Sequence, residues 1–203
     1  MATGARQERK LATRARVLAA ARDLFDEVGF EDTTIRMVAK RAGVSVGSVF
    51  TTFSGKAELL SQVMADRVEA LQAELDRVIP HLHGPTVDRL RSIMAVHYGF
   101  ETRRLRLFVA YVAASFSWPL GGAMTPIGVN RRFRGALADV LTGGIARGEV
   151  RGDLDLELFV DALLAAYVWN YRRPAQDGAD AQTLIAAMDR QIGLLFDGAA
   201  ARV

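Results

Sequence analysis

The chain contains no cysteine, and this absence limits the kinds of covalent cross-link and metal site that it can form. None of its 203 residues is a cysteine, so disulfide frameworks and zinc sites built from thiolates are excluded. The N-terminus lacks the charged-then-apolar pattern of a signal peptide, and the longest apolar runs, 107–115 and 162–169, are too short to span a bilayer. We therefore expect a cytoplasmic protein with no membrane partner.

Motifs for catalysis and cofactor binding are also missing. The sequence has no G-x-x-x-x-G-K-[ST] loop and no dinucleotide-binding loop, and its scattered serine and acidic residues form no nucleophile or acid–base signature. His81 and His83 are one residue apart in a proline–glycine loop without a neighbouring carboxylate, so we expect exposed loop residues rather than metal ligands. The sequence predicts no enzyme, no catalytic residues, no metal and no cofactor.

Helical periodicity runs through the whole chain. Apolar residues make up 50% and charged residues 24%, the balance of a soluble globular protein, and no run of strict alternation predicts a strand. We expect two short helices between 33 and 53, and longer helices at 8–28, 55–79, 86–101, 103–117, 125–147, 154–171 and 181–196. The predicted fold is all-α, with about nine helices.

The expected helices fall into two groups. A small N-terminal unit, residues 1–54, precedes the long helix at 55–79, which Pro80 terminates. The later helices are separated by breaks that contain proline and glycine. We therefore predict a second, larger helical domain over 55–203.

Residues 33–60 carry the most specific pattern in the chain. A short amphipathic helix ends at Gly43, because glycine adopts the left-handed conformation of a helix C-terminus without steric cost. Ser45 can cap the next short helix through its side-chain oxygen, and Gly47 and Ser48 leave the start of that helix free of bulk. Two short helices joined by a glycine turn are typical of a helix-turn-helix, whose second helix enters the major groove of DNA.

Positive charge is concentrated in the same segment. Residues 1–56 hold ten lysines and arginines against six acidic residues, whereas the rest of the chain holds sixteen against seventeen. An ordinary solvated surface is the alternative explanation of this positive charge. Its coincidence with the helix-turn-helix pattern instead favours a surface that binds a polyanion.

The segment from about 12 to 62 resembles the N-terminal domain of the tetracycline-repressor (TetR) family of bacterial transcription regulators. The positions that agree at fixed spacing are Thr34, Ala39, Ala42, Gly43, Val44, Ser45, Gly47, Ser48, Phe53, Lys56, Leu59 and Leu60, preceded by Leu24, Phe25, Gly29 and Phe30. Beyond this segment the agreement is in length, helical pattern and helix order. The resemblance implies a three-helix DNA-binding domain, a long connecting helix and a C-terminal domain for effector binding and dimerisation.

Carried over by position, the resemblance also implies two sets of DNA-contacting residues. The base and phosphate surface comprises Arg36, Val46, Gly47, Ser48, Thr51 and Thr52, and the backbone-contacting rim comprises Thr34, Ser45, Phe50 and Lys56. Arg36 can donate two hydrogen bonds to guanine, and the methyl groups of Val46 and the threonines suit those of thymine. A solvated charge is the alternative for Arg36, and a core position for Phe50. Phe50 stands where the family usually has tyrosine, so we expect a recognition surface without the phenolic hydroxyl that would reach a phosphate.

Aromatic residues are frequent between 93 and 171, as in small-molecule sites of helical bundles and in ordinary cores. The resemblance implies an effector cavity here. Our candidates for polar contacts are His97, Tyr111 and Asn170, and those for an apolar wall are Phe108, Phe133 and Trp169. Such a site suits a small lipophilic effector, and core packing is the alternative for each residue.

The last two expected helices carry apolar faces wider than one layer of packing requires. Ala162, Ala165 and Ala166 permit close approach, so two helices from each of two subunits can form a four-helix dimer interface, as the resemblance also implies. One short recognition helix rarely supplies both affinity and specificity. Two-fold related DNA-binding domains contact half-sites about 34–36 Å apart, or multiples of that.

The sequence therefore predicts a ligand-responsive DNA-binding transcriptional regulator, a homodimeric repressor that a small lipophilic effector releases from a palindromic operator. Two alternatives stay open. A sequence-tolerant architectural DNA-binding protein without an effector would bind unrelated duplexes equally, with a steep salt dependence. A helical small-molecule-binding protein or enzyme would show ligand binding or turnover without DNA affinity, which the basic N-terminal segment argues against.

Overall fold

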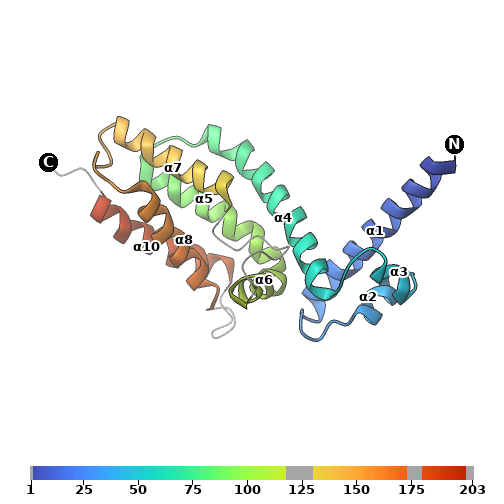
Figure 1. Cartoon of the computed structure of the whole chain (residues 1–203). Coiled ribbons are helices and arrows are strands. Elements are labelled where there is room, and N and C mark those ends of the chain that lie inside the picture. The colour runs from blue at the N-terminus through green and yellow to red at the C-terminus, as the bar shows by residue number, and fades with distance from the viewer. Residues whose placement is uncertain (1, 118–129, 173–179, 200–203) are drawn as a thin grey trace. The chain divides into compact units, whose positions relative to one another are not determined.

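Helices form the regular secondary structure, as the periodicity predicts. The computed structural model describes residues 2–117, 130–172 and 180–199, and within these ranges it contains no β-sheet (Figure 1). The α-helices are α1 (Ala2–Glu27), α2 (Ile35–Ala42), α3 (Val46–Phe50), α4 (Lys56–Val78), α5 (Thr86–Glu101), α6 (Leu105–Ser117), α7 (Arg131–Ala146), α8 (Leu156–Asn170) and α10 (Ala181–Ala199). Short 3-10 helices, Ile79–His81 and Thr102–Arg104, follow α4 and α5. The all-α prediction is confirmed.

The first helix is longer than predicted. It begins at Ala2 rather than near residue 8, because its first turns are rich in good helix formers but lack the apolar periodicity that the prediction followed. α4 ends at Val78, just before Pro80, as predicted. Residues 125–129 of the expected helix at 125–147 lie outside the described residues, and α7 begins at Arg131.

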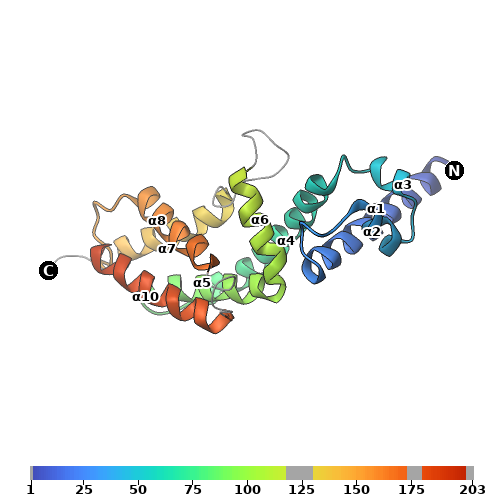
Figure 2. The same cartoon turned by 90° about the horizontal axis from the view of Figure 1, so that it is seen from below.

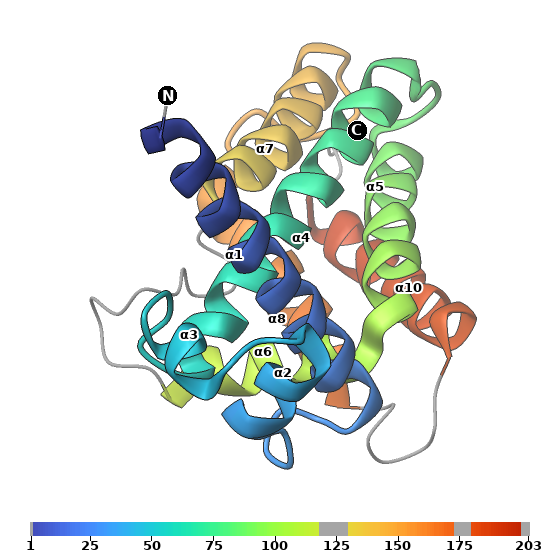
Figure 3. The ribbon, with the colours of Figure 1, turned by 90° about the vertical axis from the view of Figure 1, so that its right-hand side faces the viewer.

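One compact unit takes in Met1–Glu69 and Arg104–Thr125. In it α1 packs against α2 and α6, and α2 packs against α3; Figure 3 shows the α1–α2–α3 part. The core residues include Val17, Leu24, Phe25, Val38, Val49, Phe53, Leu59, Leu60 and Leu107. The predicted pair of short helices is therefore part of a packed unit, to which α6 also belongs.

A second compact unit takes in Ala70–Arg103 and Pro126–Val203. Its helices form a closed ring of contacts, because α5 packs against α7 and α10, and α8 packs against the same two helices (Figure 2). The side chains inside the ring include Leu90, Ile93, Met94, Tyr98, Leu137, Leu163, Leu184 and Ile192.

The start of α5 is fixed to the end of α7 by a tight contact at Gly144. A Cβ atom at Gly144 would lie 2.8 Å from Val150 Cγ2 and closer still to Thr86 Oγ1, so only glycine fits. Glu149 accepts a hydrogen bond from the Thr86 backbone N–H at 2.5 Å and one from Arg147 at 2.7 Å. These hydrogen bonds lower the pKa of Glu149 to about 2, that from Arg147 contributing most.

The compact units divide the chain inside α4, between Glu69 and Ala70. The division at 54/55 predicted from the sequence concerns function, and it stays a prediction. α6 groups by packing with the helix-turn-helix rather than with the ring of α5, α7, α8 and α10.

Candidate nucleic-acid interface

The turn between α2 and α3 has the geometry that the sequence predicts. Gly43 is left-handed, with φ of 64°, and the Val44 N–H donates to the Ala39 carbonyl at 3.0 Å. Ser45 caps α3, because its Oγ accepts the Ser48 N–H at 3.1 Å. Thr34 caps α2 in the same way, accepting the Met37 N–H at 3.2 Å. Both predicted rim hydroxyls thus also define where a helix begins.

α3 is anchored by one side and presents the other to solvent. Val49 is completely buried and Phe53 nearly so. On the opposite side, Val46 is 38% and Phe50 55% exposed, so Phe50 is a surface residue rather than part of the core. Gly47 and Thr51 are exposed too, and Ser48 and Thr52 are half-buried.

Most hydroxyl protons in and next to α3 are used in local hydrogen bonds. Thr51 Oγ1 lies 2.9 Å from the Gly47 carbonyl oxygen and 3.0 Å from that of Ser48, and Thr52 Oγ1 lies 3.3 Å from the latter. The hydroxyls of Ser45 and Ser48 are 2.8 Å apart. This arrangement leaves methyl groups and oxygen lone pairs for an approaching base edge.

Arg36 lies in the first turn of α2 and is exposed. Within the described part of the chain, no hydrogen bond or ion pair engages its guanidinium. It is therefore available for a bidentate contact.

Lys56, at the start of α4, is engaged inside the protein. Its ammonium donates to the carbonyl oxygens of Phe30 at 2.6 Å and Glu31 at 2.9 Å, and it lies 4.4 Å from the centroid of the Phe30 ring. These contacts tie the α1–α2 connection to the beginning of α4. Sequence reasoning gave Lys56 a phosphate contact and missed this role, which depends on two carbonyls distant in sequence.

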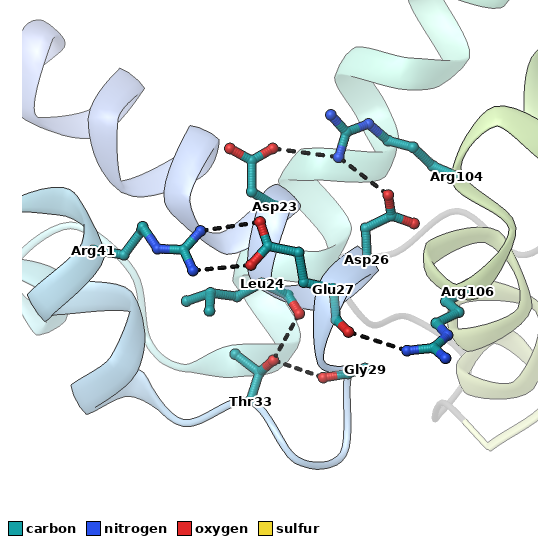
Figure 4. A network of polar contacts seen from close by, with 9 residues as sticks. All are labelled: Asp23, Leu24, Asp26, Glu27, Gly29, Thr33, Arg41, Arg104 and Arg106. Carbon is teal, nitrogen blue, oxygen red and sulfur yellow. Dashed lines mark hydrogen bonds and ion pairs between the residues drawn. The ribbon is translucent and has the colours of Figure 1, made fainter.

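Several carboxylates lie at the C-terminal end of α1, and arginines from two other helices form ion pairs with them (Figure 4). Arg41 of α2 makes a bidentate pair with Glu27, at 3.2 and 2.9 Å, and this pair lowers the pKa of Glu27. Arg104 lies 3.3 Å from Asp23 and 3.4 Å from Asp26. Acidic groups at a helix C-terminus oppose the helix dipole, so these cations offset an unfavourable charge arrangement.

Two further hydrogen bonds close this end of α1 (Figure 4). Arg106 of α6 donates to the Glu27 carbonyl oxygen at 3.0 Å. The buried Thr33 hydroxyl donates to the Gly29 carbonyl oxygen at 2.6 Å and lies 3.3 Å from that of Leu24. α6 is thus joined to the DNA-binding helices by polar contacts that the sequence did not predict.

Two of the effector candidates, His97 and Phe133, meet in the second unit. Their ring centroids are 4.6 Å apart, and the Tyr167 ring lies 4.7 Å from His97. The Tyr167 hydroxyl is 2.6 Å from His97 Nδ1. Burial lowers the pKa of His97 to about 3, so the ring is neutral at pH 7 and shares a hydrogen bond with the Tyr167 hydroxyl through Nδ1.

Asn170 belongs to the same polar cluster. Its side-chain N–H groups donate to the Tyr98 hydroxyl at 3.0 Å and to Gln191 at 2.7 Å, and Gln191 donates back to it at 3.1 Å. The Tyr98 hydroxyl in turn donates to the Tyr167 carbonyl oxygen at 3.1 Å. Burial raises the pKa of both tyrosines, which stay protonated.

The other effector candidates are on α6 and on the outer side of α8. Phe108 and Tyr111 are buried on α6, in the first unit, with ring centroids 6.2 Å apart. Trp169 is 60% exposed on α8, and the Arg172 guanidinium lies 4.3 Å from its ring centroid. Trp169 thus lies at the surface of α8, because the sequence does not show which side of this helix is outermost.

Over the described ranges no helix is long and apolar enough to cross a membrane. No three potential metal-binding side chains come together in these ranges either. His81 and His83 are exposed, as predicted.

Comparison with known proteins agrees with this geometry. A family model described as "Bacterial regulatory proteins, tetR family" matches residues 17–63, which cover the second part of α1, the α2–α3 pair and the start of α4. The chain is 27% identical to the HTH-type transcriptional regulator SrpR of Pseudomonas putida over 145 residues, 71% of this chain and 67% of that protein. It is 31% identical to the regulator BetI of Klebsiella pneumoniae over 114 residues, 53% and 57% of the two chains. The chain thus spans just over half the length of BetI.

The whole fold matches crystal structures as well. The repressor FadR of Thermus thermophilus, solved in complex with lauroyl-CoA, superposes with a TM-score of 0.67 at 25% identity, over 94% of this chain and 96% of that one. KstR2 of Mycobacterium tuberculosis, described as a ketosteroid transcriptional regulator, superposes with a TM-score of 0.64 at 23% identity, over 93% and 95%, and shows likeness of fold. With a capped helix-turn-helix in the segment that matches the tetR family of bacterial regulatory proteins, and with helices in the described residues that follow it in sequence, the chain is a DNA-binding transcriptional regulator similar to members of that family.

Proposed function

We propose that the protein is a homodimeric repressor, acting in the cytoplasm without catalysis, that binds a palindromic operator and leaves it when a lipophilic effector binds. Residues 1–54 contact DNA, and residues 55–203 bind the effector and dimerise. One observation carries this proposal: a left-handed Gly43 turn sets a Ser45-capped α3 with its outer side chains exposed. An architectural binder without base recognition would not need Arg36, which is exposed in the first turn of α2 and makes no hydrogen bond or ion pair with the described residues.

The proposed contacts follow from side-chain chemistry. Arg36 donates to guanine O6 and N7, while Val46 and the exposed Thr51 approach thymine methyl groups. Gly47 and Ser48 allow the start of α3 to come close, and Thr52 completes the surface. The rim residues Thr34, Ser45, Phe50 and Lys56 contact the sugar–phosphate backbone, with Lys56 using the N–H that its internal bonds leave free.

A dimer interface on α8 is supported by an exposed apolar stripe. Leu158 is 65% and Trp169 is 60% exposed, and Ala162 and Ala165 lie between them at helical spacing on the same side. Leu194 of α10 is 76% exposed. We propose that these residues meet their two-fold equivalents, and that Trp169 contributes to this interface rather than to the effector site.

The effector we propose is amphipathic, with a long apolar chain and a polar head. The Thermus thermophilus FadR, 25% identical to this chain, was crystallised with lauroyl-CoA, which makes long-chain acyl-CoA the first class to test. The neutral His97–Tyr167 pair beside Phe133, together with Asn170, supplies polar partners within an apolar ring of helices. Phe108 and Tyr111, which are buried on α6 in the first unit, stay candidates on the ground of the sequence alone.

Selection of bound duplexes from a random pool tests the DNA-binding proposal. We expect a palindrome whose half-site centres are one helical turn apart, about 34–36 Å, or a multiple of that spacing. Recovery of unrelated sequences, with similar affinity for each, would show that the protein is an architectural binder instead.

The recovered operator then serves to test the effector. Lauroyl-CoA should release the protein from this duplex, whereas coenzyme A, which lacks the apolar chain, should not. Laurate shows whether the chain alone is enough. If neither lauroyl-CoA nor laurate changes the affinity for the operator, the proposed effector class is wrong.

A further inference from the structure

We infer that the N-terminal half of α1 is a second DNA-binding element, which holds the sugar–phosphate backbone through one cationic side of the helix. This inference rests on the proposed function, because it needs a duplex bound at α3. It adds a surface that lies outside the matched segment, 17–63.

The first half of α1 extends beyond the core of its unit. The helix begins at Ala2, but among the residues whose burial is described the first fully buried one is Val17. At about 1.5 Å per residue, the stretch before Val17 is about 22 Å long. An isolated helix of this length has little stability in water, so a partner that covers it would also stabilise it.

The cations of this stretch lie on one side. With about 100° per residue, the five basic residues fall within an arc of about 160°, and Glu8 lies on the opposite side. The basic residues are Arg6, Arg9, Lys10, Arg14 and Arg16. Further along the helix, Val17 and Leu24 point in the same direction as the middle of this arc, and both are buried. The side that packs into the core in the second half of α1 is therefore the cationic side in the first half.

Contacts made by Arg14 show where this side faces. Arg14 hydrogen-bonds Gln62 of α4, and its guanidinium lies 5.5 Å from the centroid of the ring of Phe53, three residues after the end of α3. In Figures 1 and 2 the N-terminal end of α1 and α3 both lie on the right-hand side of the unit, and Figure 3 shows the first turns of α1 extending away from α3. A duplex that contacts α3 thus comes within reach of the cations that precede Arg14.

These cations have no internal role. Arg6, Arg9, Lys10 and Arg16 are exposed, and in the described part of the chain they take part in no hydrogen bond or ion pair. Like charges on one helix side repel each other, and phosphate groups would offset that repulsion. Long, flexible cationic side chains without a fixed geometry suit backbone phosphates rather than base edges.

The experiment uses the full-length protein and its selected operator, with affinity measured over a series of salt concentrations. The variant Arg6→Gln/Arg9→Gln/Lys10→Gln keeps good helix formers and removes three charges. It should bind the operator more weakly and show a smaller slope of log affinity against log salt, by about 0.9 for each lost phosphate contact. The ranking among operator variants should not change, because we propose that these side chains contact no base, and the melting temperature should not fall, because they make no hydrogen bond or ion pair in the described part of the chain.

Two matched variants complete the design. Arg77→Gln/Arg89→Gln/Arg131→Gln removes the same charge from the second unit and should leave the slope as in the parent protein. Arg6→Lys/Arg9→Lys keeps the charge and should keep the affinity. An unchanged slope in the Gln triple variant would overturn the inference, as would a changed ranking, which would mean base recognition. Failure of the parent protein to bind any duplex would instead refute the proposed function itself.

Discussion

Lys56 combines an internal contact with a position at the proposed DNA surface. Two of its three ammonium N–H groups hold the carbonyls of Phe30 and Glu31, and one remains for a phosphate oxygen. Arg36, by contrast, makes no internal bond within the described residues. The two cations therefore differ in what their removal would change.

Lys56→Met should weaken binding to all duplexes about equally and also lower the free energy of unfolding, by about 1.5–3 kcal/mol, since hydrogen bonds to a charged group are lost.

Arg36→Ala should leave stability unchanged and alter the ranking among operator variants, by about 1–3 kcal/mol at one base pair. Urea denaturation and competition binding measure the two effects. A Lys56→Met protein as stable as the parent would contradict the internal role, and an unaltered ranking would contradict that of Arg36.

His97 gives a pH dependence of known sign. Its ring has an ordinary pKa of 6.5, which burial lowers to about 3 in the folded protein. Below pH 6.5 only the unfolded chain takes up this proton, so stability falls as pH drops from 6.5 towards 3, by up to about 1.4 kcal/mol per unit. Between pH 7 and 5 the parent should lose about 2 kcal/mol more than His97→Gln in urea denaturation. Parallel losses would show that the ring is protonated in the folded state.

At the level of elements, α5 and α7 approach each other closely enough at Gly144 to exclude a methyl group. Gly144→Ala should lower the free energy of unfolding by about 1–3 kcal/mol, as overpacking does. Gly135→Ala in the same helix is the matched control, because nothing lies within 4 Å of the added Cβ, and it should raise stability by about 0.5–1 kcal/mol. Thermal unfolding of both variants measures the contrast. Equal stability would mean that α5 and α7 are not tightly packed here.

How far the sequence predicted each element depended on how local its signals are. The ends of α2 and α3 follow from Gly43 and Ser45, which act on the next few backbone groups, and both predictions are confirmed. The prediction of where α1 begins was wrong, because the first turns of this helix have no apolar stripe. The contacts of Lys56 and Arg104 join residues far apart in sequence, so no local pattern shows them. The same holds for Phe108 and Tyr111, which pack with the first unit.

At the level of the whole molecule, the exposed stripe on α8 predicts self-association. Ala165→Arg places a charge in the middle of that stripe, so it should convert the dimer to a monomer and weaken operator binding. Sedimentation velocity measures the first effect and operator titration the second. Ala73→Arg, on an exposed position of α4, should leave the dimer intact. A dimer that survives Ala165→Arg would move the interface away from α8.

The position of α6 limits how hybrid regulators can be made from this chain. Transplanting residues 1–54 onto a foreign body would remove Arg104 and Arg106, and with them the partners of Asp23 and Asp26 and of the last carbonyl of α1. A graft that carries residues 104–117 along with the DNA-binding helices would retain them. The part that can be exchanged therefore consists of two separate segments of the sequence, and a hybrid made with a single splice point cannot contain both.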